Sequence, residues 1–344
     1  MLKNYLKISF REIYNNKIFS IIHILGVAIG IAAFLLILRY AQFELSYDNF
    51  YKNADNIYRV RQDRYDKGKL STTWGAGCAA IGPALKKEFP EVIDYARLSN
   101  VNGIITTNQD KFREEKIFAA NTSFLTIFPV KLIGGIDTSA LNDPYTAVIS
   151  KSIADKYFGQ ENPMGKTFKL NNSENFKITG VFNDVPENTH LKFNILISWP
   201  TYIVWNGPDI ETAWFWDGYY TYILLQKNVD VKAFEKKMND FTGKQIADRT
   251  RQFNQSAKYT LQPLKSIHLN SHLMWEAEVN GDSGMVYFLL LIAFIILIIA
   301  WVNYTNLSTV KALLRSKEVG VRKVTGALKS QLVKQFLTES FINN

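Results

Sequence analysis

The chain has 344 residues, a formal net charge of +9, four histidines and one cysteine. Its length suffices for one sizeable core or two small ones, and a single cysteine excludes an intramolecular disulfide framework. The positive excess does not indicate nucleic-acid binding, because it lies in two short segments and not on a folded surface. Residues 1–17 carry +3, residues 303–344 carry +5 and Arg39 carries the rest, whereas residues 40–284 hold 28 charges of each sign.

After the basic segment 1–17, residues 18–38 contain no charge. At about 1.5 Å per helical residue they reach across a hydrocarbon core about 30 Å thick, which predicts a transmembrane helix over residues 18–42. The stretch is longer than the apolar part of a signal peptide, so we expect an uncleaved anchor. Gly26 and Gly30 have a spacing that lets helix backbones approach closely, and we expect them to pack against a neighbouring helix.

Residues 43–284 mix strand and helix patterns, which predicts an α+β domain with two subdomains. The first elements expected are a hairpin over 56–74 that turns at Lys67-Gly68, a helix that stops before Pro90, and strands within 95–107 and 111–121. A strand then leads into a helix that is capped by Ser150 and ends at Phe158-Gly159, followed by a strand pair across 171–175. The last elements expected are a strand over 218–226, an amphipathic helix with Val231, Phe234, Met238 and Phe241 on its buried side, and a strand over 259–264.

This region shows no catalytic or metal-binding pattern. It contains no GxSxG, HExxH, CxxC or glycine-rich phosphate loop. His268 and His272 are four apart, but the surrounding residues read as extended or loop, so no metal site is expected. Cys78 is expected to be a small buried apolar residue. The aromatic residues between Trp199 and Tyr222 suit either a core or a binding groove, and a core is the more common outcome.

A second uncharged stretch, residues 283–310, predicts a transmembrane helix over 285–307. The alternative of two buried core helices requires more surrounding protein than this chain can supply twice. Since cationic flanks remain on the cytoplasmic side, both termini are expected inside, with residues 43–284 outside. Residues 308–344 are predicted to continue as a helical stalk to Gly326 and then as a basic amphipathic helix, which suits the inner membrane surface or a cytoplasmic partner.

Several segments resemble one family in the same order. RSKEVGVRKVTGALKSQLVKQFLTES (315–340) resembles the cytoplasmic segment of FtsX-like permeases. FAANTSFLTIFPVKLIGG (118–135), ALNDPYTAVISKSIADKYFGQENPMGKTF (140–168) and FKITGVFNDVPENTHLKFNIL (176–196) resemble the MacB-like periplasmic core domain of the same transporters. The likeness extends over the whole chain.

The resemblance implies a non-catalytic permease subunit of a mechanotransmission-type ABC transporter in the inner membrane. It implies no cofactor, because ATP is bound and hydrolysed by a separate chain. The implied partners are an ABC ATPase subunit, a second permease copy or homologous half, and membrane lipid, with no nucleic acid. The positions carried over as ATPase-coupling residues are Glu318, Gly320, Arg322, Lys323, Gly326 and Ala327.

Family members continue into at least two further spanning helices, so we expect the chain to be the amino-terminal piece of a longer permease. Two other classes stay open. A membrane-anchored extracytoplasmic sensor or binding protein would carry a kinase, cyclase or methyl-accepting region inside the cell. An anchored periplasmic enzyme would need a set of catalytic residues, and residues 43–284 contain none of the catalytic motifs named above.

Overall fold

A computed structural model describes residues 17–107, 110–136, 138–215, 217–324 and 333. The chain divides into two compact units. The helical unit comprises Met1–Phe43 and Gly284–Asn344, and the α+β domain comprises Glu44–Ser283. Each is described by itself.

Two long helices form the described part of the helical unit, α2 (Lys17–Leu45) and α10 (Ser283–Val324). Their windows Ile24–Leu45 and Ser283–Asn306 are long and apolar enough to cross a membrane. Only 11% and 17% of these windows are buried inside the protein, whereas a soluble core helix would be covered. The two predicted apolar helices are therefore confirmed, and their exposed side chains suit lipid.

Helix α10 runs without interruption to Val324, well beyond the expected end of the second span at residue 307. The described helix ends there. The predicted break at Gly326 and the predicted amphipathic helix lie outside the described residues, apart from Val333.

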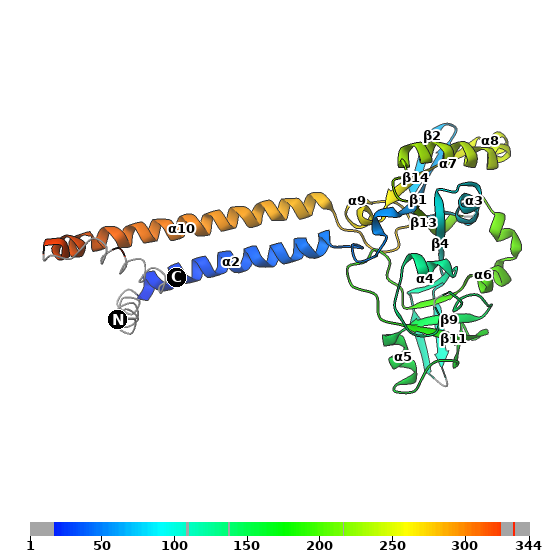
Figure 1. The fold of residues 1–344 in the computed structure, drawn as a ribbon, viewed down its shortest axis with the longest axis horizontal. Coiled ribbons are helices and arrows are strands. Elements are labelled where there is room, and N and C mark those ends of the chain that lie inside the picture. The colour runs from blue at the N-terminus through cyan, green and yellow to red at the C-terminus, as the bar shows by residue number, and fades with distance from the viewer. Residues whose placement is uncertain (1–16, 108–109, 137, 216, 325–332, 334–344) are drawn as a thin grey trace. The chain divides into compact units, whose positions relative to one another are not determined.

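The α+β domain is built on one mixed sheet (Figure 1). Its strands are β1 (Ile57–Asp66), β2 (Lys69–Trp74), β3 (Gly77–Cys78), β4 (Val92–Asn100), β5 (Gly103–Thr107), β6 (Asp110–Glu114), β7 (Ile117–Ala120), β8 (Leu132–Gly134), β9 (Thr146–Ser150), β10 (Thr167–Leu170), β11 (Glu174–Phe182), β12 (Ile195–Ser198), β13 (Asp217–Leu225) and β14 (Gln255–Pro263).

The helices of the domain are short except for one. They are α3 (Ile81–Glu88), α4 (Ser123–Ile127), α5 (Lys151–Phe158), α6 (Trp199–Asn206), α7 (Val231–Gln245), α8 (Ala247–Phe253) and α9 (Ile267–Asn270), with 3₁₀ turns η1 (Ala54–Asn56), η2 (Pro208–Thr212) and η3 (Leu264–Ser266). Figure 1 shows α7 and α8 at one end of the domain and α5 at the other.

The strand order is β14-β1-β13-β4-β7-β12-β9-β11-β10-β5-β6, with β2, β3 and β8 attached at the side. The pairs β7/β12 and β9/β11 are parallel, and the other pairs are antiparallel. The α+β class is confirmed. Main-chain hydrogen bonds join every neighbour in this path, and residues Glu44–Ser283 group into one compact unit, while the expectation of two subdomains within it stays a prediction.

Local sequence signals explain several boundaries. Lys67 and Gly68 both have positive φ, which two-residue hairpin turns require, and they join β1 to β2 as predicted. Ser150 caps α5 by accepting a hydrogen bond from the Ile153 backbone N–H, and Asp230 caps α7 by accepting from Ala233 N–H at 3.1 Å.

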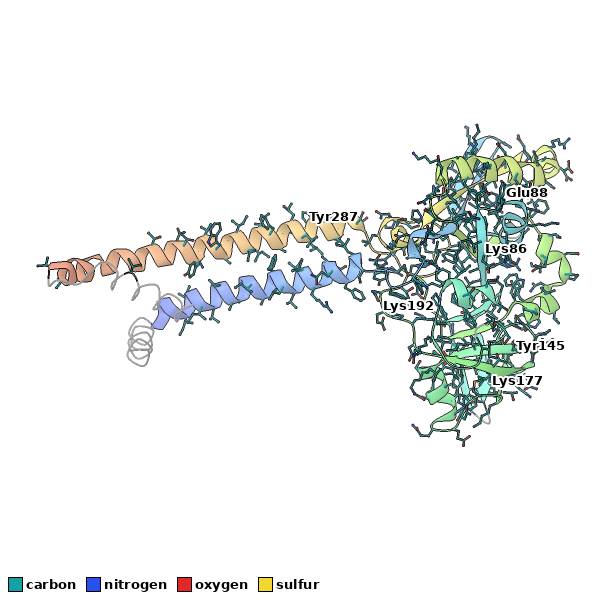
Figure 2. The ribbon with its side chains drawn as sticks, viewed as in Figure 1. Lys86, Glu88, Tyr145, Lys177, Lys192 and Tyr287 are labelled. Atoms are coloured by element: carbon teal, nitrogen blue, oxygen red, sulfur yellow. The ribbon has the colours of Figure 1, made fainter. Side chains whose placement is uncertain are left out.

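The buried apolar side chains of the α+β domain form three clusters. Ile81 and Leu85 of α3 and Phe234 and Met238 of α7 share one cluster with β1, β13 and β14. A second cluster is built around α4, β4 and β7, and a third around α5, α6, β9 and β11. Lys192, labelled in Figure 2, belongs to the loop between β11 and β12.

The aromatic region supports the core interpretation. Trp199, Tyr219, Tyr220 and Tyr222 are all buried. Trp205 and Trp214 are partly buried and pack against the clusters, and Trp216 lies outside the described residues. Cys78 is fully buried, and burial raises the pKa of its thiol to about 11.

The structure adds elements that were not predicted. Helices α6 and α8 have no counterpart among the expected elements, and β14 begins at Gln255, four residues earlier than expected. The stretch expected to be extended or loop is so at His272, which lies outside any helix or strand, whereas His268 lies in the single turn of α9.

Candidate coupling site

The chain enters the α+β domain through residues 44–56, which we call the incoming segment, and a buried carboxylate holds it. Asp48 is fully buried, and its oxygens lie 2.8 Å from Thr189 Oγ1 and 2.8 Å from His190 Nδ1 in the β11–β12 loop. His190 Nε2 lies 2.8 Å from the hydroxyl of Tyr222 on β13. Burial raises the pKa of Tyr222 well above its usual value, so the hydroxyl stays protonated. A chain of hydrogen bonds thus joins the incoming segment to the sheet.

The chain leaves the domain through residues 264–283, the outgoing segment, which is held by Arg59 of β1. This arginine is fully buried, and its guanidinium donates to Glu276 Oε2 at 2.5 Å and Oε1 at 3.0 Å. It also donates to Gln262 Oε1 at 2.6 Å and Ser271 Oγ at 2.7 Å. A two-point guanidinium–carboxylate contact fixes geometry as well as distance. The outgoing segment is therefore held to β1, the strand that directly follows the incoming segment.

The Arg59–Glu276 pair should make stability depend on pH. Burial acts to raise the pKa of Glu276, but hydrogen bonds and the charge of Arg59 outweigh it and hold the pKa below its usual value. A carboxyl whose pKa is lower in the folded state stabilises the fold above its unfolded pKa, about 4.3 for glutamate, and loses this contribution as the pH falls through the folded pKa.

We expect the free energy of unfolding to fall below pH ~4 in the natural protein, and to fall less steeply in Glu276→Gln. Denaturant titrations of the full chain at stepwise pH measure this. Glu88→Gln, at an exposed position of α3, is the control and should keep the natural slope. An identical slope in Glu276→Gln would contradict the assignment.

The incoming and outgoing segments also contact each other. Glu44 Oε2 lies 2.8 Å from His268 Nε2, and the ring of Tyr47 stacks on the His268 ring with centroids 3.3 Å apart. A Cβ on Gly281 would lie 2.7 Å from Glu44 Oε2 and 3.0 Å from His268 Nε2, so a larger residue there would displace this pair of side chains. We use the name junction for Glu44, Asp48, Arg59, His190, His268 and Glu276 together.

The junction is polar but does not form a metal site. His268 contacts Glu44, while His272 lies 3.4 Å from Asp282, so the two histidines that the spacing singled out have different partners. Across the described ranges, no group of three histidine, cysteine or acidic side chains converges as metal ligands would. Each acidic side chain of the junction lies within hydrogen-bond distance of a histidine or arginine, so these contacts hold the incoming and outgoing segments in place.

In the helical unit, the structure brings the predicted glycines against α10. A Cβ on Gly30 would lie 2.8 Å from Ala300 Cβ, and one on Gly26 would lie 3.1 Å from Asn303 Nδ2. Such distances are shorter than carbon side chains tolerate, so these positions permit close backbone approach. Ala28, on the same helix, is exposed and lies off this contact.

Four of the six predicted ATPase-coupling residues lie in the part of the chain that the structure describes, and two lie outside it. Glu318, Gly320, Arg322 and Lys323 all belong to α10, and Gly320 is exposed with open space around it. Gly326 and Ala327 lie outside the described residues. Their roles stay predictions.

Sequence reasoning did not single out the junction. Its pairs join residues far apart, 217 positions for Arg59–Glu276 and 224 for Glu44–His268. One weak signal existed, because Arg59 lies two residues from Ile57 and would share its face of a strand. A charged residue on a face that also carries a buried apolar side chain requires a buried partner.

Comparison with known proteins decides the family. Residues 20–241 match the MacB-like periplasmic core domain. The chain belongs to the MacB-like periplasmic core domain family. Residues 290–343 match the FtsX-like permease C-terminal family, so this MacB-like chain combines the two domains of ABC transporter permeases.

Relatives agree with this assignment. The chain is 23% identical to the uncharacterised ABC transporter permease YvrN of Bacillus subtilis, over 98% of this chain and 82% of YvrN. It is 22% identical to the macrolide export ATP-binding/permease protein MacB of Aggregatibacter actinomycetemcomitans, over 70% of this chain but only 35% of that protein. A crystallised permease domain from Porphyromonas gingivalis shares the fold, with a TM-score of 0.56 and 23% identity over 70% of this chain and 98% of that domain.

Proposed function

We propose that the MacB-like chain is the permease subunit of a mechanotransmission-type ABC transporter. A separate ATPase binds the cytoplasmic end of α10, and its ATP-driven movement is relayed through α2 and α10 to the α+β domain, which handles an exported or envelope substrate. Both termini are cytoplasmic and residues 43–284 are periplasmic, in keeping with the basic flanks. The functional assembly contains a second permease copy or homologous half.

The junction is the observation that carries this proposal. Both chain connections of the domain are continuous with apolar helices, and both are tied to the same sheet by buried polar contacts. The connections are also tied to each other through Glu44 and His268. Displacement of either helix therefore moves the sheet instead of unravelling a flexible linker, as relay of movement requires.

Copurification from the cells that make the protein tests the proposal. The solubilised full chain should retain a second chain with the GxxxxGK[ST] signature, and the complex should hydrolyse ATP. Glu318→Arg reverses a charge, and Gly326→Pro constrains the backbone at the predicted break. Each change should lower the ATP hydrolysis of the recovered complex at least severalfold, which corresponds to a loss on the order of 1 kcal/mol in the free energy of binding or coupling.

Arg251→Glu, a charge reversal at an exposed position of α8, is the control and should leave the hydrolysis unchanged. Equal hydrolysis with all variants would remove Glu318 and Gly326 from the coupling role. Retention of a kinase or cyclase without an ATPase would favour the sensor alternative.

A further inference from the structure

A second feature of the α+β domain lies apart from the junction. A cavity of about 270 Å³ opens among β1, β2, β14 and the chain that flanks α8, at the end of the domain where α7 and α8 lie in Figure 1. Rings of Trp74, Trp214 and Phe215 and the side chain of Ile246 form its apolar walls, polar side chains line the rest, and no junction residue lines it. A concave site that combines apolar walls with polar groups can bind and orient a small molecule.

One cation in this cavity lacks a counter-charge. The guanidinium carbon of Arg249 lies 4.3 Å from the centroid of the Phe215 ring and 5.4 Å from that of Phe253. Arg249 makes no ion pair with any residue that the structure describes. A guanidinium that stacks on rings keeps its N–H edge free for a two-point contact with an acid.

A second cation lies close by. The guanidinium carbon of Arg64 lies 5.1 Å from the centroid of the Trp74 ring, and its head group pairs with Asp217. Burial, followed by the charge of Arg249, lowers the pKa of Arg64, so the two guanidinium groups repel each other across the cavity. Asp66, the acid that lines the cavity, is exposed and pairs with neither arginine within the described ranges.

We propose that this cavity binds a small organic anion with a flat apolar body and one carboxylate. The rings of Trp74 and Phe215 contact the flat body, and Arg249 receives the carboxylate. A single anionic charge would relieve the repulsion between the two guanidinium groups. The volume lies just below the usual range for drug-sized ligands, which fits one or two fused rings. The site is independent of the transporter assignment.

Isothermal titration of the full chain in nanodiscs tests this, with naphthalene-2-carboxylate as the probe and naphthalene-2-carboxamide as its uncharged counterpart. Arg249→Gln should weaken carboxylate binding about tenfold, since hydrogen bonds to charged groups contribute about 1.5–3 kcal/mol. Arg251→Gln is the matched control on the same helix, because Arg251 is exposed, pairs with Asp248 and does not line the cavity. Uptake of the probe by lipid is the same for every variant, so it cancels when the affinities of the variants are compared.

Arg249→Lys retains the charge without the planar fork and should bind with intermediate affinity, which separates loss of the contact from misfolding. The carboxamide should bind more weakly than the carboxylate and should not respond to Arg249→Gln. Equal affinity for the two probes, equal losses in Arg249→Gln and Arg251→Gln, or no saturable binding beyond that of empty nanodiscs would each overturn the site.

Discussion

Replacing Arg59 by methionine is expected to lower the free energy of unfolding of the α+β domain by about 3–5 kcal/mol, because it leaves a buried carboxylate without its partner. The Glu276 side chain is only 13% exposed, so water replaces the guanidinium only in part. Gln262 and Ser271 lose a hydrogen bond in the same change. Denaturant unfolding of the full chain in detergent, followed by near-ultraviolet circular dichroism, measures the effect.

Arg61→Met is the matched control, because Arg61 lies two residues along the same strand. Its side chain is 34% exposed and its acidic partner Asp63 is 3.9 Å away, so its loss should cost less than about 1 kcal/mol. Arg59→Met combined with Glu276→Gln should recover part of the loss, since no charge is then left unpaired. If Arg59→Met and Arg61→Met lowered the free energy of unfolding equally, burial of the Arg59–Glu276 pair would contribute nothing to stability.

Gly30→Leu is expected to separate α2 from α10. Its Cβ alone would lie 2.8 Å from Ala300 Cβ, and the rest of the leucine cannot fit into that contact without movement of a helix. Overpacking of a close contact typically costs about 1–3 kcal/mol. The helices should therefore move apart or lose their fixed register, and the distribution of distances between them should widen.

Spin labels on Leu36→Cys and Leu291→Cys measure this distribution, since both side chains are exposed on the two helices. The buried Cys78 is replaced by alanine in this background. Ala28→Leu is the control, as Ala28 is exposed on α2 and should leave the distances unchanged. An unchanged distribution in Gly30→Leu would exclude a packing role for this glycine.

Elements with strong local signals were predictable. The turn at Lys67-Gly68, the Ser150 cap and the apolar stripe of α7 each depend on residues that are neighbours in sequence, and the structure places all three as expected. The two apolar helices follow from composition and length alone. Such features need no knowledge of distant partners.

The junction depends on partners that local patterns do not reveal. Asp48 meets His190, which lies 142 positions further along the chain, and nothing near either residue marks the other. The same limit applies to the order of the strands. Local patterns predict the strands themselves, but they do not reveal that the parallel pair β7/β12 and the antiparallel pair β9/β12 join successive groups of strands into one sheet.

The burial of Cys78 has a consequence for reactions between copies of the chain. It is the sole cysteine in these 344 residues, and burial raises the pKa of its thiol to about 11, which keeps the sulfur in the unreactive protonated form. Two folded copies therefore do not form a disulfide through Cys78, and oxidation of this thiol requires local unfolding of the sheet around it.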